Sequence, residues 1–332
     1  MLELDPSAQE FWRGRTVFIT GANGFIGANL IRHLLALNAN VHVLLRPSAA
    51  IWRIENCIHQ LIVHIADLRH EAQVISSVVD SRPDVIFHLA TGRGVNQNQR
   101  TNYVQTGILG AAHIVEALRR LENCRLVVAG SSLEYGSSDG PISESCPLAP
   151  HTLHGAVKAA ASILLSQAAL AEQLAISQLR LFHVYGPWES SHRFLPRAFQ
   201  SAIKDTSVDL VSGLSRRDWV YVIDVVRALL LAAHSQAPTG IYNIGSGVEH
   251  TNEEVLTKLE QVLDRKILRN SNVLPPRLTD QAHRYADISA ARIALDWSPR
   301  YDLTTGIKST LSWWNEYPTI WENTHDSAPI VQ

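Results

Sequence analysis

The chain has 332 residues, enough for one large domain or two smaller ones with a substantial core. Hydrophobic residues make up 46% and charged residues 18%, a composition typical of globular rather than disordered proteins. The net charge of -2 gives no electrostatic reason to expect a nucleic acid or an anionic membrane as a partner.

The cysteines and the apolar segments bear on compartment. Cys57, Cys124 and Cys146 lack metal-ligand spacing, so we predict no metal site and expect free thiols in a reducing cytoplasm. The N-terminal residues show no signal-peptide pattern, and no uncharged apolar run reaches the ~18 residues of a membrane span. We therefore expect a cytoplasmic protein.

Short apolar segments alternate with longer helical ones through the first half of the chain. Strands are predicted at 16–20, 40–45, 61–66, 84–90, 125–130 and 177–184, and helices at 25–37, 106–121 and 154–173. Continuous apolar runs between helices are typical of parallel strands that are buried on both faces. The pattern predicts an α/β fold with a Rossmann-type doubly wound parallel sheet.

A glycine-rich turn links the first predicted strand to the first predicted helix in "TVFITGANGFIG". Such glycines permit a tight turn and close approach of the backbone to a pyrophosphate, and the helix N-terminus then offers unpaired N–H groups. Because strand and helix are both present, the motif predicts a dinucleotide site. Its predicted cofactor-binding residues are Gly21, Asn23, Gly24, Phe25, Ile26 and Gly27.

The end of the second predicted strand bears on the choice of cofactor. NAD-binding folds place an acidic residue there for the ribose hydroxyls, but this chain has Leu45 followed by Arg46. A guanidinium can donate two hydrogen bonds to a 2′-phosphate. Arg46 therefore favours NADP(H), with NAD(H) as the alternative.

Eight motifs occur in one order along the chain: "TGANGFIG", "ADL", "FHLA", "GSSLEYG", "HGAVK", "VYGP", "RRDWVYVIDVVRA" and "YNIGSG". In this set, which covers residues 15 to about 315, the sequence resembles the extended short-chain dehydrogenase/reductases. Specifically, it resembles their NAD(P)-dependent epimerase/dehydratase family, which acts on nucleotide sugars. The resemblance implies that Asp67 and Leu68 face the adenine and that Leu89 and Ala90 line the cofactor channel.

The resemblance also implies two functional parts. Residues 1–182 would form the Rossmann domain, with a return near 213–246, and residues 183–332 would form a smaller α/β C-terminal domain that binds the substrate. Related proteins dimerise through two helices, which correspond here to 106–121 and 154–173. The second of these is apolar on nearly every face, so we expect a homodimer.

The family's catalytic residues are a Ser or Thr, a Tyr and a Lys, and one of the three differs here. Ser131 and Lys158 match their positions, but His154 stands where the resemblance expects the Tyr that carries the proton. Next to Lys158, the pKa of His154 should fall, so that the ring serves better as a base than as an acid.

Three explanations of His154 stay open. In the first, the imidazole replaces the phenol as acid and base. In the second, another group in the same loops supplies the proton, with His151, Tyr135 and Tyr185 as candidates. Alternatively, the protein binds its cofactor as a sensor or scaffold without turning over a substrate.

The resemblance assigns the substrate side as well. Arg217 and Arg277 would clamp a nucleotide diphosphate, because paired guanidiniums suit a pyrophosphate, and Ser132 and His183 would lie beside the sugar. His183 replaces the usual Asn, a second departure from the family pattern. The expected substrate is a nucleotide sugar.

Dehydration is disfavoured by the residues that follow Ser131. Dehydratases of the family place Asp and Glu directly after the hydroxyl residue, whereas this chain has Ser132 and Leu133, with Glu134 one position late. Hydride transfer then remains, either as ketoreduction of a nucleotide-linked 4-keto sugar or as epimerisation through a transient ketone. Arg46 favours the NADPH-dependent ketoreductase.

Overall fold

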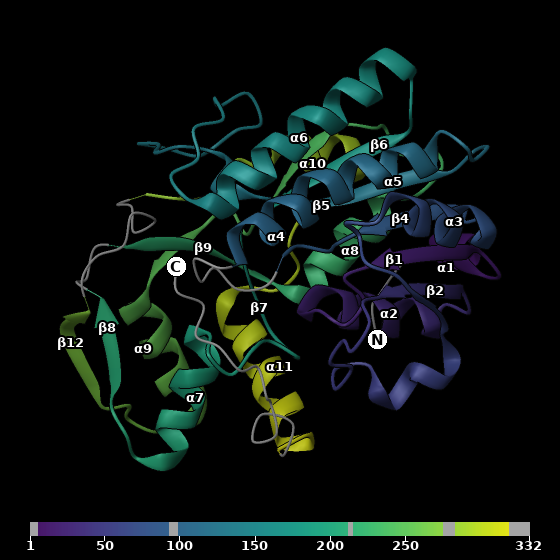
Figure 1. Cartoon of the computed structure of the whole chain (residues 1–332). Helices are drawn as coiled ribbons and strands as arrows, with labels where there is room; N and C mark the ends of the chain where they lie inside the picture. Colours follow the sequence, from purple (N-terminus) through teal and green to yellow (C-terminus); the bar gives the residue numbers. More distant parts are fainter. Residues whose placement is uncertain (1–5, 93–98, 212–214, 275–282, 319–332) are drawn as a thin grey trace.

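A parallel sheet of seven strands forms the centre of the computed structural model, which describes residues 6–92, 99–211, 215–274 and 283–318. The strands lie in the order β10-β6-β5-β4-β1-β2-β3, and every neighbouring pair is parallel (Figure 1). They span Thr16–Thr20 (β1), Asn40–Leu45 (β2), Ile62–Ile65 (β3), Val85–His88 (β4), Arg125–Ser131 (β5), Ile176–Leu181 (β6) and Ile241–Ile244 (β10). The predicted Rossmann-type fold is confirmed.

Helices cover both faces of the sheet (Figure 1). α3, α5 and α6 pack on one face, and α2 and α8 pack on the other. Their bounds are Phe25–Ala36 (α2), Glu71–Ser81 (α3), Gly110–Leu118 (α5), Leu153–Glu172 (α6) and Val222–Ala232 (α8). α1 (Pro6–Trp12) precedes β1, and a 3₁₀ turn spans Glu55–Gln60.

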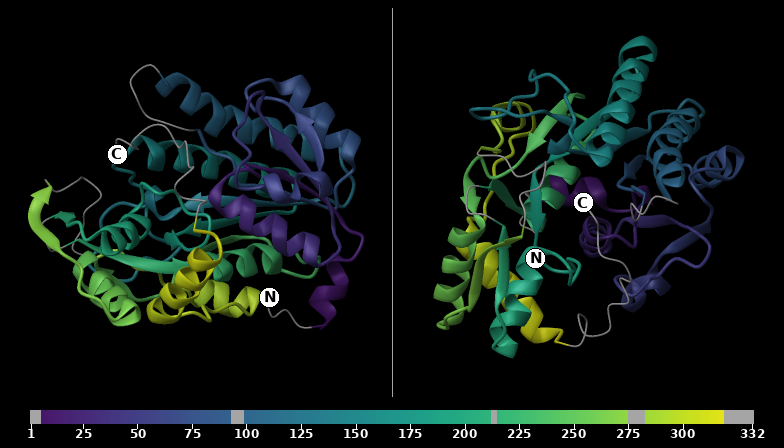
Figure 2. Two further views of the ribbon diagram at one scale, coloured as in Figure 1. Left: turned by 90° about the horizontal axis from the view of Figure 1, so that it is seen from below. Right: turned by 60° about the vertical axis from the view of Figure 1, so that its left-hand side comes forward.

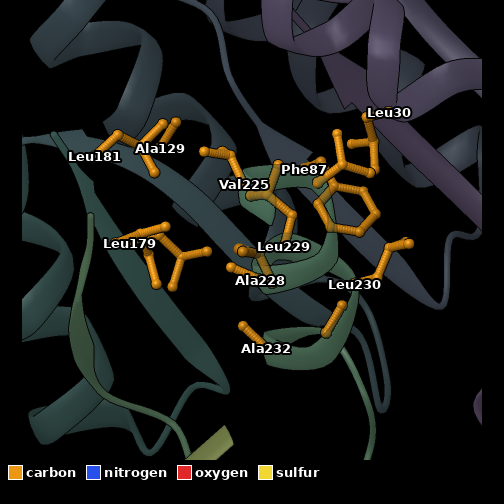
Figure 3. Packing of buried hydrophobic residues seen from close by; sticks show 14 of the residues in the cluster. Leu30, Phe87, Ala129, Leu179, Leu181, Val225, Ala228, Leu229, Leu230 and Ala232 are labelled. Atoms are coloured by element: carbon orange, nitrogen blue, oxygen red, sulfur yellow. The ribbon is translucent and has the colours of Figure 1, made fainter. Parts of the chain in front are cut away.

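Successive side chains of a strand point to opposite faces of the sheet, so each inner strand contributes to the hydrophobic core on either face. Phe18 of β1 packs beneath α3 and α5, whereas Val17 and Ile19 join the core beneath α2 and α8. Figure 3 shows Val225 of α8 in this second core, in the same cluster as Phe87 of β4. Because both of their faces are buried, inner strands such as β1 and β4 are mostly apolar, whereas β3 at the edge of the sheet exposes Ile62 and Ile65.

A second lobe follows β6. A three-stranded sheet in the order β11-β9-β7 and a two-stranded pair, β8 with β12, pack with three helices on a core of their own. These elements are β7 (His183–Tyr185), α7 (Phe194–Lys204), β8 (Val208–Val211), β9 (Arg216–Tyr221), β11 (Glu249–Thr251), α9 (Asn252–Leu263), β12 (Arg269–Leu274) and α11 (Leu303–Glu316). In both views of Figure 2 the green part of this lobe lies away from the blue elements, and in the left view the yellow α11 reaches the purple elements.

The chain passes between the two parts more than once. β10 pairs with β6, and α8 covers the sheet, so residues 222–244 pack with the nucleotide-binding half. α10 (Ser289–Leu295) also packs on this side. The expectation of one strand over 177–184 is wrong: β6 ends at Leu181, Phe182 lies outside both strands, and β7 then joins β9 in the other sheet.

The helix predicted at 106–121 begins earlier and is irregular. α4 (Arg100–Val104) leads into a π-helical turn over Gln105–Leu109, and α5 follows directly. Single π turns inside helices are uncommon and are frequent near functional sites.

α6 alone among the described helices has the length and hydropathy of a membrane span. It packs against β5, β6 and α5, as the core helix of a globular domain does. This packing accounts for its buried residues, whereas Ile163 and Leu170 of the same helix are exposed.

One close contact seats α6 against the end of β5. A Cβ added to Gly155 would lie 2.0 Å from the Leu133 carbonyl oxygen, so only glycine permits this approach. The Thr152 hydroxyl accepts a hydrogen bond from the Gly155 N–H at 3.0 Å and caps the helix.

We predict that Gly155→Ala lowers the free energy of unfolding by about 1–3 kcal/mol, because backbone must move to admit the methyl group. Urea denaturation measures the loss. Gly140→Ala is the matched control, since its Cβ would meet nothing within 4 Å. Equal stability of the two variants would contradict the contact.

Candidate active site

The predicted cofactor loop lies at the carboxyl end of β1, beside the end of β4. Gly21 has φ +73°, and a Cβ there would lie 2.7 Å from the Ala90 N. A Cβ on Gly27 would lie 2.3 Å from the Gly21 oxygen. Gly24 caps α2 without a side-chain hydrogen bond, so the first N–H groups of the helix are open to an anion. This cradle of bare backbone fits a dinucleotide pyrophosphate.

The other residues of the motif hold the loop. The Asn23 amide donates to the Ala50 carbonyl at 2.8 Å. Phe25 and Ile26 begin α2 and pack against the core on that face. All six predicted residues thus lie in one loop and the first turn of α2. Only Gly21, Gly24 and Gly27 form the bare cradle, and the other three hold it in place.

The residues predicted to face the adenine and the channel lie at the ends of neighbouring strands. Arg46 is exposed directly after β2. Asp67 forms an ion pair with Arg69 at 2.8 Å, and its pKa is lowered chiefly by that hydrogen bond and further by Arg46. Leu68 is buried against Gly110.

The half-buried Leu89 and Ala90 follow β4. The Leu89 N–H donates to the Thr20 carbonyl at 3.1 Å, which holds this segment beside the end of β1. Parallel strands thus gather the predicted cofactor residues at one edge, where the strand order reverses.

Ser131 ends β5 and begins a 3₁₀ turn over Ser132–Glu134. Its hydroxyl accepts from the Leu133 N–H at 3.2 Å, and the Glu134 carboxylate accepts from the Ser131 N–H at 2.7 Å. Glu134 is fully buried and pairs with the buried Arg180 at 2.8 Å. The carboxylate that follows the predicted catalytic serine therefore points into the protein, where it fixes the backbone of Ser131.

Lys158 and His154 lie one turn apart on α6. The Lys158 ammonium donates to the Ala129 carbonyl at 2.6 Å, two residues before Ser131. Burial lowers the pKa of Lys158 to about 8, opposed by the charge of Glu134. Burial, with smaller effects of Lys158 and Arg193, lowers the pKa of His154 to about 4. At neutral pH the imidazole is uncharged beside a largely protonated ammonium.

Tyr103 of α4 is a residue that the sequence analysis missed. It is buried, and its hydroxyl forms a hydrogen bond with Nδ1 of His154. The two ring centroids lie 6.2 Å apart. The hydroxyl also lies 3.4 Å from Thr91 Oγ1. No local pattern could reveal this contact, because 51 residues separate the two rings along the chain.

The three alternative proton donors have other surroundings. The Tyr135 hydroxyl donates to Asn243 and accepts from Arg180, each at 2.8 Å. Tyr185 lies in the core of the second lobe, and its hydroxyl faces the Asp302 and Leu303 carbonyls. The exposed His151 approaches only Ser137, at 3.5 Å. None of these three side chains has a hydrogen bond to His154 among the described residues.

The residues predicted to bind the substrate come from the second lobe and from the turn after β5. The Arg217 guanidinium donates to Asn252 at 3.1 Å. Ser132 is buried, and His183 packs edge-on against Trp219 with ring centroids 4.2 Å apart. Burial lowers the pKa of His183, so this ring is also neutral. Arg277 lies outside the described residues.

Arg284 is the second residue that the sequence analysis missed. It donates to the Ser132 carbonyl at 2.8 Å, and burial, together with the charge of Arg217, lowers its pKa to about 10. Its Nε is buried and has no hydrogen-bond partner within the described part of the chain. One feature of the sequence could have revealed Arg284. It stands just before the "AD" pair, Ala286 and Asp287, which in the family pattern follows the second arginine.

Comparison with known proteins identifies the family. The sequence model of the NAD dependent epimerase/dehydratase family matches residues 17–245. This chain belongs to that family. The resemblance is thereby confirmed, and the chain is an enzyme of the extended short-chain dehydrogenase/reductase type.

Members with different reactions are similar to it over most of its length. The UDP-glucose 4-epimerase of Mycolicibacterium smegmatis is 30% identical over 312 residues, which cover 88% of this chain and 96% of the relative. The dTDP-glucose 4,6-dehydratase of Streptomyces niveus is 26% identical over 329 residues, or 92% and 94% of the two chains. The structure of MoeE5 in complex with UDP-glucose and NAD matches with a TM-score of 0.76 and 29% identity, covering 91% and 99%. The family alone therefore leaves the reaction open.

We predict that Glu134→Ala destabilises the fold by about 3–5 kcal/mol, because it leaves the Arg180 charge buried without its partner. Guanidinium denaturation measures this loss. A double variant with Leu at positions 134 and 180 should recover much of it. Glu116→Ala, which removes one partner of a surface ion pair, is the control and should cost far less than Glu134→Ala, because solvent screens the pair. A similar small cost for Glu134→Ala would contradict the buried pair.

Proposed function

We propose that this protein is a cytoplasmic, NADPH-dependent ketoreductase that acts on a nucleotide-linked 4-keto sugar. The observation that carries the proposal is the placement of Ser131, His154 and Lys158 at the end of β5, on the edge where the glycine cradle lies. It combines a site for a dinucleotide with hydrogen-bonding and ionisable groups for a carbonyl oxygen.

The glycine cradle and the open N-terminus of α2 would hold the pyrophosphate of the cofactor. Arg46 would meet the 2′-phosphate, and Lys158 would hold the nicotinamide ribose. When bound, the nicotinamide supplies or accepts a hydride. MoeE5 and other solved relatives carry NAD, so the preference for NADP(H) rests on Arg46 alone.

The Ser131 hydroxyl would hydrogen-bond the substrate oxygen, and His154 would exchange a proton with it. Lys158 bears a positive charge near this oxygen and stabilises negative charge that develops there. Burial keeps the imidazole neutral, and the same charge adds to this effect. His154 thus meets the substrate as a neutral ring.

Two features bear on the kind of reaction. Glu134 is occupied by Arg180 and by the Ser131 N–H, so it has no freedom to serve as the acid or base of a dehydration. Epimerisation through a transient ketone is the second candidate, favoured by the UDP-glucose 4-epimerase at 30% identity. The exposed Arg46 favours the reductase.

Arg284 and Arg217 would bind the diphosphate of the substrate. A phosphate oxygen would satisfy the buried Nε of Arg284, which otherwise carries the cost of an unpaired donor. It would also relieve the repulsion between the two guanidiniums. Ser132 and His183 would then lie on the sugar side.

A homodimer through α5 and α6 belongs to the same proposal. Leu109, Ile163 and Leu170 on and near these helices are 44%, 61% and 85% exposed. Exposed apolar side chains that recur along one helix, as Ile163 and Leu170 do along α6, are typical of an interface between subunits.

We predict that Arg46→Ala weakens NADPH binding about 10- to 100-fold and leaves NADH binding nearly unchanged, because only NADPH carries the 2′-phosphate. Fluorescence titration of the intact protein with each cofactor measures both affinities. Arg13→Ala, which removes another exposed arginine, is the control. Equal dissociation constants for the two cofactors in the parent protein would refute the NADP(H) preference.

We also predict reduction of a dTDP- or UDP-linked 4-keto sugar by the protein with NADPH, followed as loss of absorbance at 340 nm. Arg284→Ala should weaken binding of UDP or dTDP about tenfold or more and spare the dinucleotide, since it removes a charged donor to phosphate. Arg120→Ala on the surface is the control. If neither keto sugar is reduced and Arg284→Ala binds both nucleotides as the parent does, the proposed function is wrong.

A further inference from the structure

The pKa values at the site raise a problem for the proposed proton transfer. A ketone that accepts a hydride must also gain a proton on its oxygen. With a pKa of about 4, the His154 imidazole carries no spare proton at neutral pH. A neutral imidazole can give up its N–H proton readily only if its second nitrogen gains one at the same time. The identity of the group at that second nitrogen therefore decides whether His154 can act.

The group at the second nitrogen is the Tyr103 hydroxyl. A phenol is protonated at neutral pH, and burial raises the pKa of Tyr103 further. Its O–H can donate to Nδ1, while the Thr91 hydroxyl, 3.4 Å away, can donate to the phenol oxygen. Nδ1 then accepts, so the proton of the neutral ring lies on Nε2. Nε2 has no hydrogen-bond partner among the described residues.

The charged groups around His154 favour a neutral ring that accepts a hydrogen bond from Tyr103. Lys158 on the same helix and Arg193 before α7 both lower the pKa of the ring, so a second proton on it is disfavoured. Tyr103, from α4, is the one further ionisable group with a hydrogen bond to the ring within the described residues. The ring therefore releases one proton as it gains another, and it is not protonated on both nitrogens.

We propose that Tyr103 is the proton source of this site and acts through the imidazole of His154. The inference rests on the proposed function and adds a residue to it. The carbonyl carbon gains the hydride that the nicotinamide supplies, and the oxygen gains the Nε2 proton. Nδ1 takes the phenol proton as Nε2 loses its own. The imidazole remains neutral with its tautomer exchanged, and Tyr103 is left as phenolate until water restores its proton.

The arrangement keeps a phenol in the reaction although position 154 is a histidine. Tyr103 reaches the substrate only through another side chain, so it is a positioning and relay residue, while His154 is the catalytic one. The matching reverse transfer would serve an oxidation: Nε2 takes the alcohol proton and Nδ1 returns one to the phenolate. The relay is therefore compatible with an epimerase as well.

The test compares Tyr103→Phe with the parent and with Tyr242→Phe, which removes a hydroxyl bonded to the Pro238 carbonyl elsewhere in the fold. In the intact protein labelled with ¹⁵N-histidine, the spectrum of His154→Gln assigns the His154 signals. We expect the parent ring to be neutral at pH 7, with its proton on Nε2. Its Nδ1 signal should move in Tyr103→Phe and stay in place in Tyr242→Phe.

Single-turnover reduction of a dTDP-linked 4-keto sugar with NADPH gives the second readout. Tyr103→Phe should slow it about 100-fold or more, the usual contribution of a positioned proton donor, with cofactor affinity unchanged. The dependence of the rate on the deuterium content of the solvent should show two moving protons in the parent and one in the variant.

A proton on Nδ1 in the parent, or an Nδ1 signal that Tyr103→Phe does not move, would overturn the relay. So would an undiminished rate in that variant. The spectra decide the Tyr103–His154 hydrogen bond even if no keto sugar turns over, and that outcome would count against the proposed function instead.

Discussion

The seating of α6 against the end of β5 is the contact on which the site depends. Gly155 lets the helix approach the Leu133 carbonyl, and the Lys158 ammonium reaches the Ala129 carbonyl from the same side. A side chain at position 155 would lift the N-terminal turn of α6 away from the sheet. His154 and Lys158 would then move together relative to Ser131, because one helical turn joins them.

Burial of charge sets the chemistry of this contact. Lys158 and Arg180 are the cations beneath the site, and the fully buried Glu134 interacts with both. The carboxylate stabilises the ammonium, fixes the Ser131 backbone and is itself held by Arg180. Burial of His154, with the nearby positive charge as a smaller effect, keeps the ring neutral. A neutral imidazole makes the hydrogen bond at its second nitrogen decisive for any transfer of a proton.

Residues from the later part of the chain lie against the turn after β5. Ser132 belongs to the turn after β5, and Arg284 reaches it from the far part of the chain. Arg217 of β9 lies close enough to lower the pKa of Arg284. The fold therefore brings a buried guanidinium, that of Arg284, close to the half-buried guanidinium of Arg217.

The sequence by itself determined the elements and the loops at their ends. β1 and β2 have the predicted bounds, since strands buried on both faces require continuous apolar runs. The glycine spacing located the cradle, because a Cβ would collide with backbone at Gly21 and Gly27. Motif order identified the family, which the family comparison confirmed.

Only the tertiary structure decided which side chains complete the site. Tyr103 meets His154 because the π-helical turn that follows α4 packs on α6, and Arg284 meets Ser132 across 152 residues of chain. Neither contact can be predicted from the periodicity of apolar residues within a helix or strand. The same reason explains the break at Phe182, where an apolar run continues in sequence while the chain changes sheets. Local patterns record which residues are buried, whereas the partner of a buried polar group is chosen by the packing of distant elements.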